Sequence, residues 1–88
     1  MSKFKYNLAV IGLGYVGLPL AIEAANSKLK VAGYDINESV VDSLNKSISH
    51  VEDISDKVLQ DALSKDLIIT SDSSVLGDSE YIVISVPT

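Results

Sequence analysis

Several residue types are missing from this sequence, which has no cysteine, no arginine and no tryptophan. Without cysteine, these residues form no disulfide, no thiolate metal site and no cysteine nucleophile. No apolar run approaches the roughly 18–20 residues that a transmembrane helix needs, and the N-terminal residues lack the small-residue cleavage site of a signal peptide. We therefore expect no membrane contact and a cytoplasmic location.

The absence of arginine also bears on the ligands. The formal net charge is −5 and is uneven, because residues 1–30 carry +3 and residues 31–88 carry −8. Nucleic-acid affinity depends on neutralising phosphates, and arginine is the usual bidentate partner of phosphate monoesters. We expect no nucleic-acid partner, and we interpret the acidic part as a solvated surface that favours solubility.

The residues that are present indicate a single α/β domain. A chain of 88 residues has room for one domain with a small core, and 47% apolar residues are typical of a globular protein. Apolar runs of strand length alternate with segments of helical period. The predicted strands are 8–11, 29–34, 67–70 and 81–86. The first predicted helix is 15–27, the second is capped by Asn37 and ends before a loop at 46–54, and the third is 55–65. A short helical turn is predicted to end at Leu76–Gly77.

This order predicts a Rossmann-like parallel sheet with flanking helices and right-handed crossovers. The predicted inner face of the first helix is Val16, Leu20, Ala21, Ala24 and Ala25. The sequence stops at Thr88, directly after a strand that we expect to be buried, and such a strand needs cover on both faces. We interpret residues 1–88 as the truncated N-terminal part of a larger domain, which alone would self-associate or be poorly stable.

The segment Gly12–Gly17, GLGYVG, matches the pattern G-x-G-x-x-G. It follows a predicted strand and opens a predicted helix. Asp35 stands at the end of the next strand, 18 residues beyond Gly17. Together these features form the dinucleotide-binding fingerprint.

Each glycine of this segment has a physical role. Gly12 permits the tight turn that leaves the strand, Gly14 lets a pyrophosphate approach the backbone, and Gly17 lets the helix pack close to the strands. Free amides around Tyr15 and Val16 would donate to phosphate oxygens, and the helix dipole adds a favourable field. The alternative is a glycine-rich turn that only packs.

Asp35 distinguishes between the nicotinamide cofactors. A carboxylate at this position accepts hydrogen bonds from ribose hydroxyls and repels a 2′-phosphate, and the next residues, Ile36 and Asn37, supply no cation. We therefore predict NAD rather than NADP. Two alternatives stay open: Asp35 only caps the second helix, and Ile36 either packs against adenine or belongs to the core.

The other polar residues have ordinary interpretations. His50, the single histidine, lies in a polar loop without a second histidine nearby, and we interpret it as a solvated residue rather than a ligand or a base. Glu52, Asp53 and Asp56 lack the spacing of an EF-hand, so we expect no metal site.

Tyr15 and Thr88 each lie near the expected cofactor. Tyr15 either reaches over the diphosphate or packs on the sheet edge. Thr88 follows the fourth strand at its carboxyl end, where open α/β sheets place ligands, so its hydroxyl would lie near the cofactor.

Three segments, in order, resemble the UDP-glucose/GDP-mannose dehydrogenase family. Val10–Ala21 is similar to the opening of the family, Gly33–Asn45 with GYDIN and V-x-x-L-N is similar to its second strand and helix, and Ile84–Thr88 is similar to its strand-end Val-Pro-Thr. Leu13 and Leu18–Leu20 look more like the branch that acts on UDP-N-acetylhexosamines than the UDP-glucose or GDP-mannose branches.

The resemblance implies an activity. The family oxidises the C6 alcohol of a nucleotide sugar to a carboxylate with two NAD in succession, through a thiohemiacetal and a thioester on a catalytic cysteine. Its members are cytoplasmic, usually dimers or larger, and supply uronic acids for surface polysaccharides. The cofactor-binding residues that the resemblance implies are Gly12, Gly14, Tyr15, Val16, Gly17, Asp35, Val86 and Thr88.

The sequence departs from the family in having no cysteine and in stopping before the catalytic and sugar-binding segments. We therefore expect no catalytic residue within 1–88, and these residues alone should not catalyse the reaction. Two other functions stay open: a non-enzymatic domain that senses NAD or ATP, and another NAD-dependent dehydrogenase with the same fingerprint. The coding sequence beyond Thr88 would separate them, because a cysteine-containing sugar domain indicates the enzyme.

Overall fold

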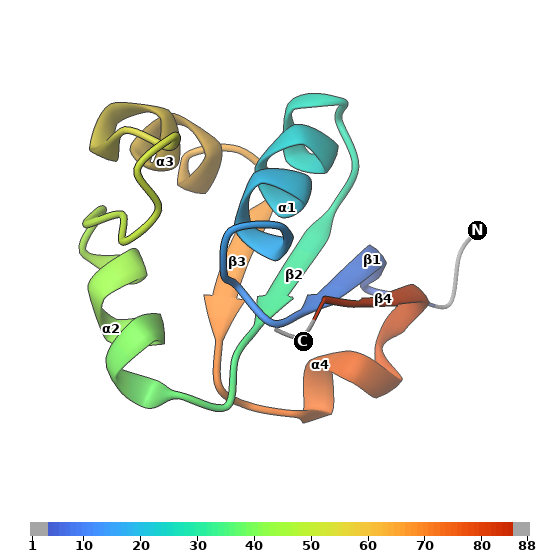
Figure 1. Cartoon of the computed structure of the whole chain (residues 1–88). Helices are drawn as coiled ribbons and strands as arrows, with labels where there is room; N and C mark the ends of the chain where they lie inside the picture. Colours follow the sequence, from blue (N-terminus) through green and yellow to red (C-terminus); the bar gives the residue numbers. More distant parts are fainter. Residues whose placement is uncertain (1–3, 86–88) are drawn as a thin grey trace.

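The computed structural model describes residues 4–85 and confirms the predicted α/β class (Figure 1). Its four strands form one parallel sheet in the order β3-β2-β1-β4. In chain order the elements are β1 (Tyr6–Ile11), α1 (Gly17–Asn26), β2 (Val31–Tyr34), α2 (Glu38–Asn45), α3 (Asp56–Leu63), β3 (Leu67–Thr70), α4 (Ser74–Gly77) and β4 (Ser79–Ile84).

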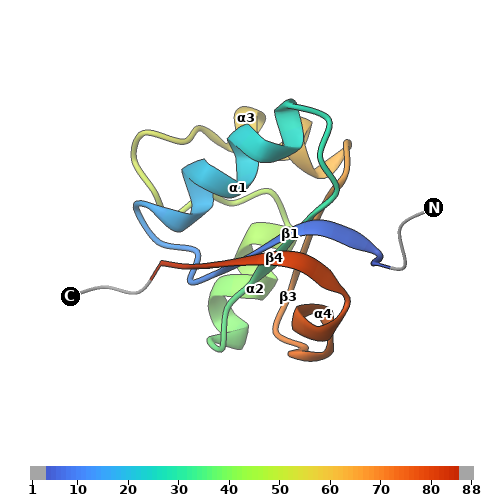
Figure 2. The ribbon, with the colours of Figure 1, turned by 90° about the vertical axis from the view of Figure 1, so that its right-hand side faces the viewer.

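The helices cover the two faces of the sheet unequally. Figure 1 shows α1, α2 and α3 together on one side of the strands and α4 on the other. The larger core cluster lies under the three helices and includes Leu18, Leu44 and Leu59, all with 0% exposure. The smaller cluster joins Ala9, Ala32 and Val75 under α4. Figure 2 shows the β1 and β4 ribbons between α1 and α4, with β4 at the edge of the sheet.

Short polar side chains fix where the helices begin. The Asn37 side-chain oxygen accepts hydrogen bonds from the amides of Ser39 and Val40 at 3.0 and 3.3 Å, and the Ser55 hydroxyl accepts from the Val58 amide at 3.1 Å. These caps satisfy amides that have no acceptor within the helix. The predicted cap at Asn37 and the predicted helix start at Ser55 are thereby confirmed.

Asp72 organises the turn before α4. Its carboxylate accepts a hydrogen bond from the Ser74 amide at 2.9 Å, and hydrogen bonds from Ser74 hold the pKa of Asp72 below its usual value. A charged acceptor at this position favours the turn. The predicted short turn ending at Leu76–Gly77 is confirmed as α4.

Two expectations about burial are wrong. Val16 and Leu20 are exposed, whereas Leu18 and Ile22 enter the core beside the predicted Ala21, Ala24 and Ala25. Val16 precedes the helix, which begins at Gly17 rather than at residue 15, so Val16 does not indicate the inner face. The last strand is also exposed, at Tyr81, Ile82 and Ile84, because β4 is the edge of the sheet.

No helix within residues 4–85 combines the length and the apolar character that crossing a bilayer requires.

Candidate cofactor site

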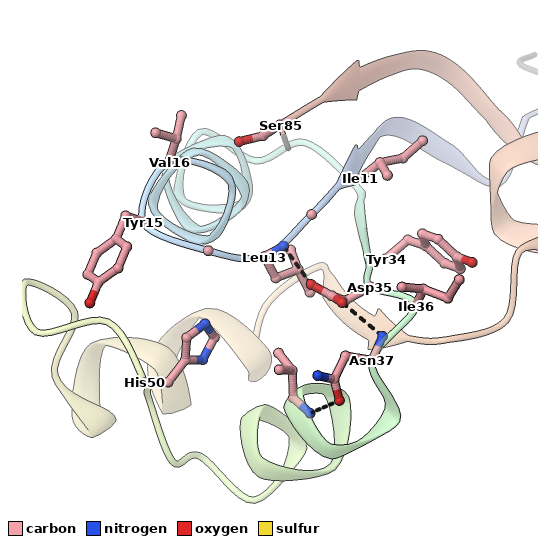
Figure 3. Close-up of a pocket in the computed structure, with 13 residues that line it drawn as sticks. Ile11, Leu13, Tyr15, Val16, Tyr34, Asp35, Ile36, Asn37, His50 and Ser85 are labelled. Atoms are coloured by element: carbon pink, nitrogen blue, oxygen red, sulfur yellow. Dashed lines mark hydrogen bonds between the residues drawn. The ribbon is translucent and has the colours of Figure 1, made fainter. Parts of the chain in front are cut away.

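A cavity of about 890 Å³ opens at the carboxyl ends of β1 and β2 (Figure 3). This is where open α/β sheets bind ligands. The lining is mainly apolar, with a few polar groups that come from different elements. The lining residues are Ile11, Gly12, Leu13, Gly14, Tyr15, Val16, Tyr34, Asp35, Ile36, Asn37, Val40, His50 and Ser85.

The inner side of the glycine loop, residues 12–17, packs against protein. Gly12 has a φ of 94°, a backbone conformation that residues other than glycine rarely adopt. A Cβ on Gly17 would overlap the carbonyl oxygen of Gly12 and lie 3.3 Å from the Cβ of Ser85. The predictions that Gly12 permits the turn and that Gly17 permits close packing are confirmed.

Leu13 holds the loop to the core. Its side chain is only 1% exposed, and a Cβ on Gly33 would lie 3.2–3.3 Å from its two terminal methyl carbons. β2 therefore carries a glycine at the point where the Leu13 side chain packs against it.

The outer side of the glycine loop is open. A Cβ on Gly14 would meet no protein atom within 4 Å. Within residues 4–85, the amides of Gly14, Tyr15, Val16 and Gly17 have no acceptor. Unpaired amides at a helix start beside open space fit a phosphate group, so the loop suits the diphosphate of a dinucleotide.

Asp35 points into the same cavity from the end of β2 (Figure 3). Its Oδ2 accepts a hydrogen bond from the Leu13 amide at 3.0 Å, and its Oδ1 accepts from the Asn37 amide at 2.9 Å. Each carboxylate oxygen can accept a second bond, so the orientation is fixed while capacity for ribose hydroxyls remains. The alternative that Asp35 only caps the second helix is wrong, because Asn37 is the cap.

Tyr15 and Ile36 lie on the surface of the site. Tyr15 is 74% exposed and lines the cavity, so it does not pack on the sheet edge. Ile36 is 83% exposed, so the alternative that it belongs to the core is wrong. Both side chains are available for contact with a ligand.

His50 and Ser85 were not expected in the site. His50 is exposed, as a solvated residue would be, but it lines the cavity. Ser85 lines it beside the glycine loop, and its amide donates to the Ile11 carbonyl at 2.7 Å. The sequence analysis missed Ser85 because it placed this residue inside the predicted strand 81–86, whereas β4 ends at Ile84 and Ser85 follows it at the carboxyl end of the sheet. Val86 and Thr88 lie outside the described residues.

Among residues 4–85, no three histidine, aspartate or glutamate side chains are grouped so that they could hold a metal ion.

The comparisons with known proteins agree with this geometry. The family model described as "UDP-glucose/GDP-mannose dehydrogenase family, NAD binding domain" matches residues 6–88. The chain belongs to this family. The cofactor of the domain is therefore NAD, as the sequence predicted.

Similar proteins point the same way. Protein CapL of Staphylococcus aureus is 39% identical over 93% of this chain and 18% of its own length. The UDP-N-acetyl-D-mannosamine dehydrogenase of Campylobacter jejuni is 35% identical over 100% of this chain and 21% of its own. This chain thus spans about a fifth of the curated relatives that it matches.

Solved structures reproduce the fold. A UDP-D-ManNAc dehydrogenase from Pyrococcus horikoshii superposes with a TM-score of 0.83 at 40% identity, over 90% of this chain and 19% of that one. A GDP-mannose dehydrogenase from Pseudomonas aeruginosa also gives 0.83, at 29% identity, over 93% of this chain and 20% of that one.

Proposed function

We propose that residues 1–88 form a partial NAD-binding domain within a nucleotide-sugar 6-dehydrogenase. The intact protein would oxidise the C6 hydroxyl of a UDP-sugar to a carboxylate with two NAD. The observation that carries this proposal is the pairing of open amides at Gly14–Gly17 with the oriented carboxylate of Asp35 in one cavity. NAD, when bound, accepts a hydride.

The residues of this chain would each bind one part of the cofactor. The amides around Tyr15 and Val16 would hold the diphosphate, and Asp35 would accept hydrogen bonds from the adenosine ribose. Ile36 and Val40, which line the cavity beside Asp35, would flank the adenine. Val86 and Thr88 would contact NAD beyond β4. Because the chain contains no cysteine, a catalytic cysteine would have to come from outside these residues.

For the substrate, we propose a UDP-N-acetylhexosamine, with UDP-glucose as the alternative. Relatives that match 91–100% of this chain bear the names UDP-N-acetyl-D-mannosamine dehydrogenase and UDP-N-acetyl-D-glucosamine 6-dehydrogenase. The Leu13 and Leu18–Leu20 pattern favours the same branch. A homo-oligomeric intact protein, a cytoplasmic location and a role in polysaccharide biosynthesis complete the proposal.

The test is a calorimetric titration of the intact protein with NAD and NADP. We expect NAD to bind more tightly, because Asp35 repels a 2′-phosphate. Asp35→Ala should weaken NAD binding by roughly 1–3 kcal/mol and narrow the difference between the two cofactors. Equal affinities in the unmodified protein would contradict the proposal.

Asp35→Asn is the matched control for this titration. An amide oxygen can still accept from the Leu13 amide, so the side chain at position 35 keeps one of its two hydrogen bonds, the one to the glycine loop. If Asn restores stability to heating but not the preference for NAD, the carboxylate charge is the discriminating feature. A UDP-N-acetylhexosamine and UDP-glucose, each added with NAD, would then identify the sugar by NADH formation.

A further inference from the structure

His50 lies at the cofactor cavity, although nothing in its sequence surroundings marks it as a ligand-binding residue. Its side chain comes from residues 46–55, the connection between α2 and α3. Figure 3 shows the imidazole directed toward the glycine loop from the opposite side of the cavity. Within residues 4–85, no hydrogen bond joins the ring to another residue, so both ring nitrogens are available to a ligand.

The two neighbours of His50 fix its position. The Ser49 amide donates to Oδ1 of Asp56 at 2.9 Å, and the Ser49 hydroxyl oxygen accepts from the Val51 amide at 3.1 Å. Val51 is 2% exposed and belongs to the larger core cluster. Because Val51 enters the core and Ser49 is tied to α3, the backbone of His50 is held beside the cavity.

The charge around the cavity gives this histidine a role. Among the described lining residues, the titratable side chains are Tyr15, Tyr34, Asp35 and His50, and His50 is the one that can carry a positive charge. A dinucleotide would bring a diphosphate with two negative charges next to the Asp35 carboxylate. Open amides offset part of that repulsion, and a cationic imidazole would offset more.

We propose that His50 is a phosphate-binding residue of the cofactor site and donates an imidazole N–H to the diphosphate from the wall opposite the glycine loop. This inference rests on the proposed function, since it requires a dinucleotide in the cavity. It adds a side-chain contact on a segment outside the glycine fingerprint.

The test compares binding of ADP-ribose and adenosine to the intact protein and to His50→Ala, by calorimetry or by displacement of a fluorescent nucleotide at pH 6.0. We expect His50→Ala to weaken ADP-ribose binding by about 3- to 10-fold, a modest charge-assisted bond at an exposed site. Adenosine, which has no phosphate, should bind equally to both proteins. An equal loss for adenosine, or no loss for ADP-ribose, overturns the proposal.

Lys46→Gln is the matched control. Lys46 is exposed at the start of the same connection and does not line the cavity, so the variant removes a positive charge of the segment without touching the site. We expect it to bind ADP-ribose as the unmodified protein does. A loss of affinity equal to that of His50→Ala would mean that the positive charge of the segment, and not a contact from His50, causes the effect, and it would overturn the proposal. Failure of the unmodified protein to bind ADP-ribose or NAD at any pH would instead contradict the proposed function.

Discussion

The glycine loop has one side packed against protein and one side open to the cavity. On the packed side, Gly12 has a positive φ and Gly17 leaves no room for a Cβ. On the open side, Gly14 has free space around it and no positive φ. The fold therefore requires glycine at Gly12 and Gly17, whereas no protein atom within residues 4–85 requires a glycine at Gly14.

This difference separates residues that build the site from residues that leave space for a ligand. Substitutions at Gly17 and Leu13 should change the free energy of unfolding, because the neighbours of these residues are protein atoms. A substitution at Gly14 should change ligand binding instead, because no protein atom would lie within 4 Å of its Cβ. Substitutions on the two sides should therefore change different measurements, and their effects on stability should decrease from the packed side to the open side.

The largest effect is expected for Gly17→Ala. The added methyl group would collide with the Gly12 carbonyl, which belongs to the backbone and cannot turn aside. We expect a loss of about 3 kcal/mol or more in the free energy of unfolding, the upper range for overpacking, together with loss of NAD binding. Urea denaturation measures the first and calorimetry the second.

Gly77→Ala is the control for that variant. A Cβ on Gly77 would meet no atom within 4 Å, and Gly77 lies in α4, away from the cavity. It should change neither stability by more than about 1 kcal/mol nor NAD affinity. A stability loss in Gly17→Ala no greater than in Gly77→Ala would break the distinction between packed and open sides.

The next effect is expected for Leu13→Ala. Removing a fully buried leucine side chain typically costs about 2–5 kcal/mol, and here it also frees the loop from β2. Gly33→Ala should destabilise the unmodified protein, because its Cβ would lie 3.2 Å from a Leu13 methyl carbon. In the Leu13→Ala background it should cost less.

A double-mutant cycle in urea measures this coupling, and we expect at least about 0.5 kcal/mol. Additive losses in the free energy of unfolding would mean that Leu13 does not pack against Gly33. The packed side of the loop would then consist of Gly12 and Gly17 alone.

The packed side was largely predictable from the sequence. Gly12, Gly17, Asp35 and the cap Asn37 act through neighbours that a turn, a helix start or a strand end places at fixed spacing. The phase of α1 was not predictable from apolar spacing alone, because Val16 precedes the helix and does not follow its period.

The opposite wall of the cavity was not predictable. His50 lies in the site because Val51 enters the core and Asp56 holds Ser49, and these are contacts between distant elements that no local pattern records. The exposure of β4 has the same origin, since strand composition does not say which strand forms the edge. Long-range packing, rather than local chemistry, was the missing information.

The smallest effect on stability is expected for Gly14→Ala. The position has free space and an ordinary φ, so alanine should leave the free energy of unfolding unchanged or raise it by about 0.4–1 kcal/mol, because it restricts the unfolded chain. NAD affinity should nevertheless fall, because the methyl group would occupy the space through which the diphosphate approaches the amides. Gly77→Ala again serves as the reference, since it adds a methyl group in open space far from the cavity. If Gly14→Ala bound NAD as tightly as Gly77→Ala, the open side of the loop would not be where the diphosphate lies, and the cofactor would have to approach the amides from another direction.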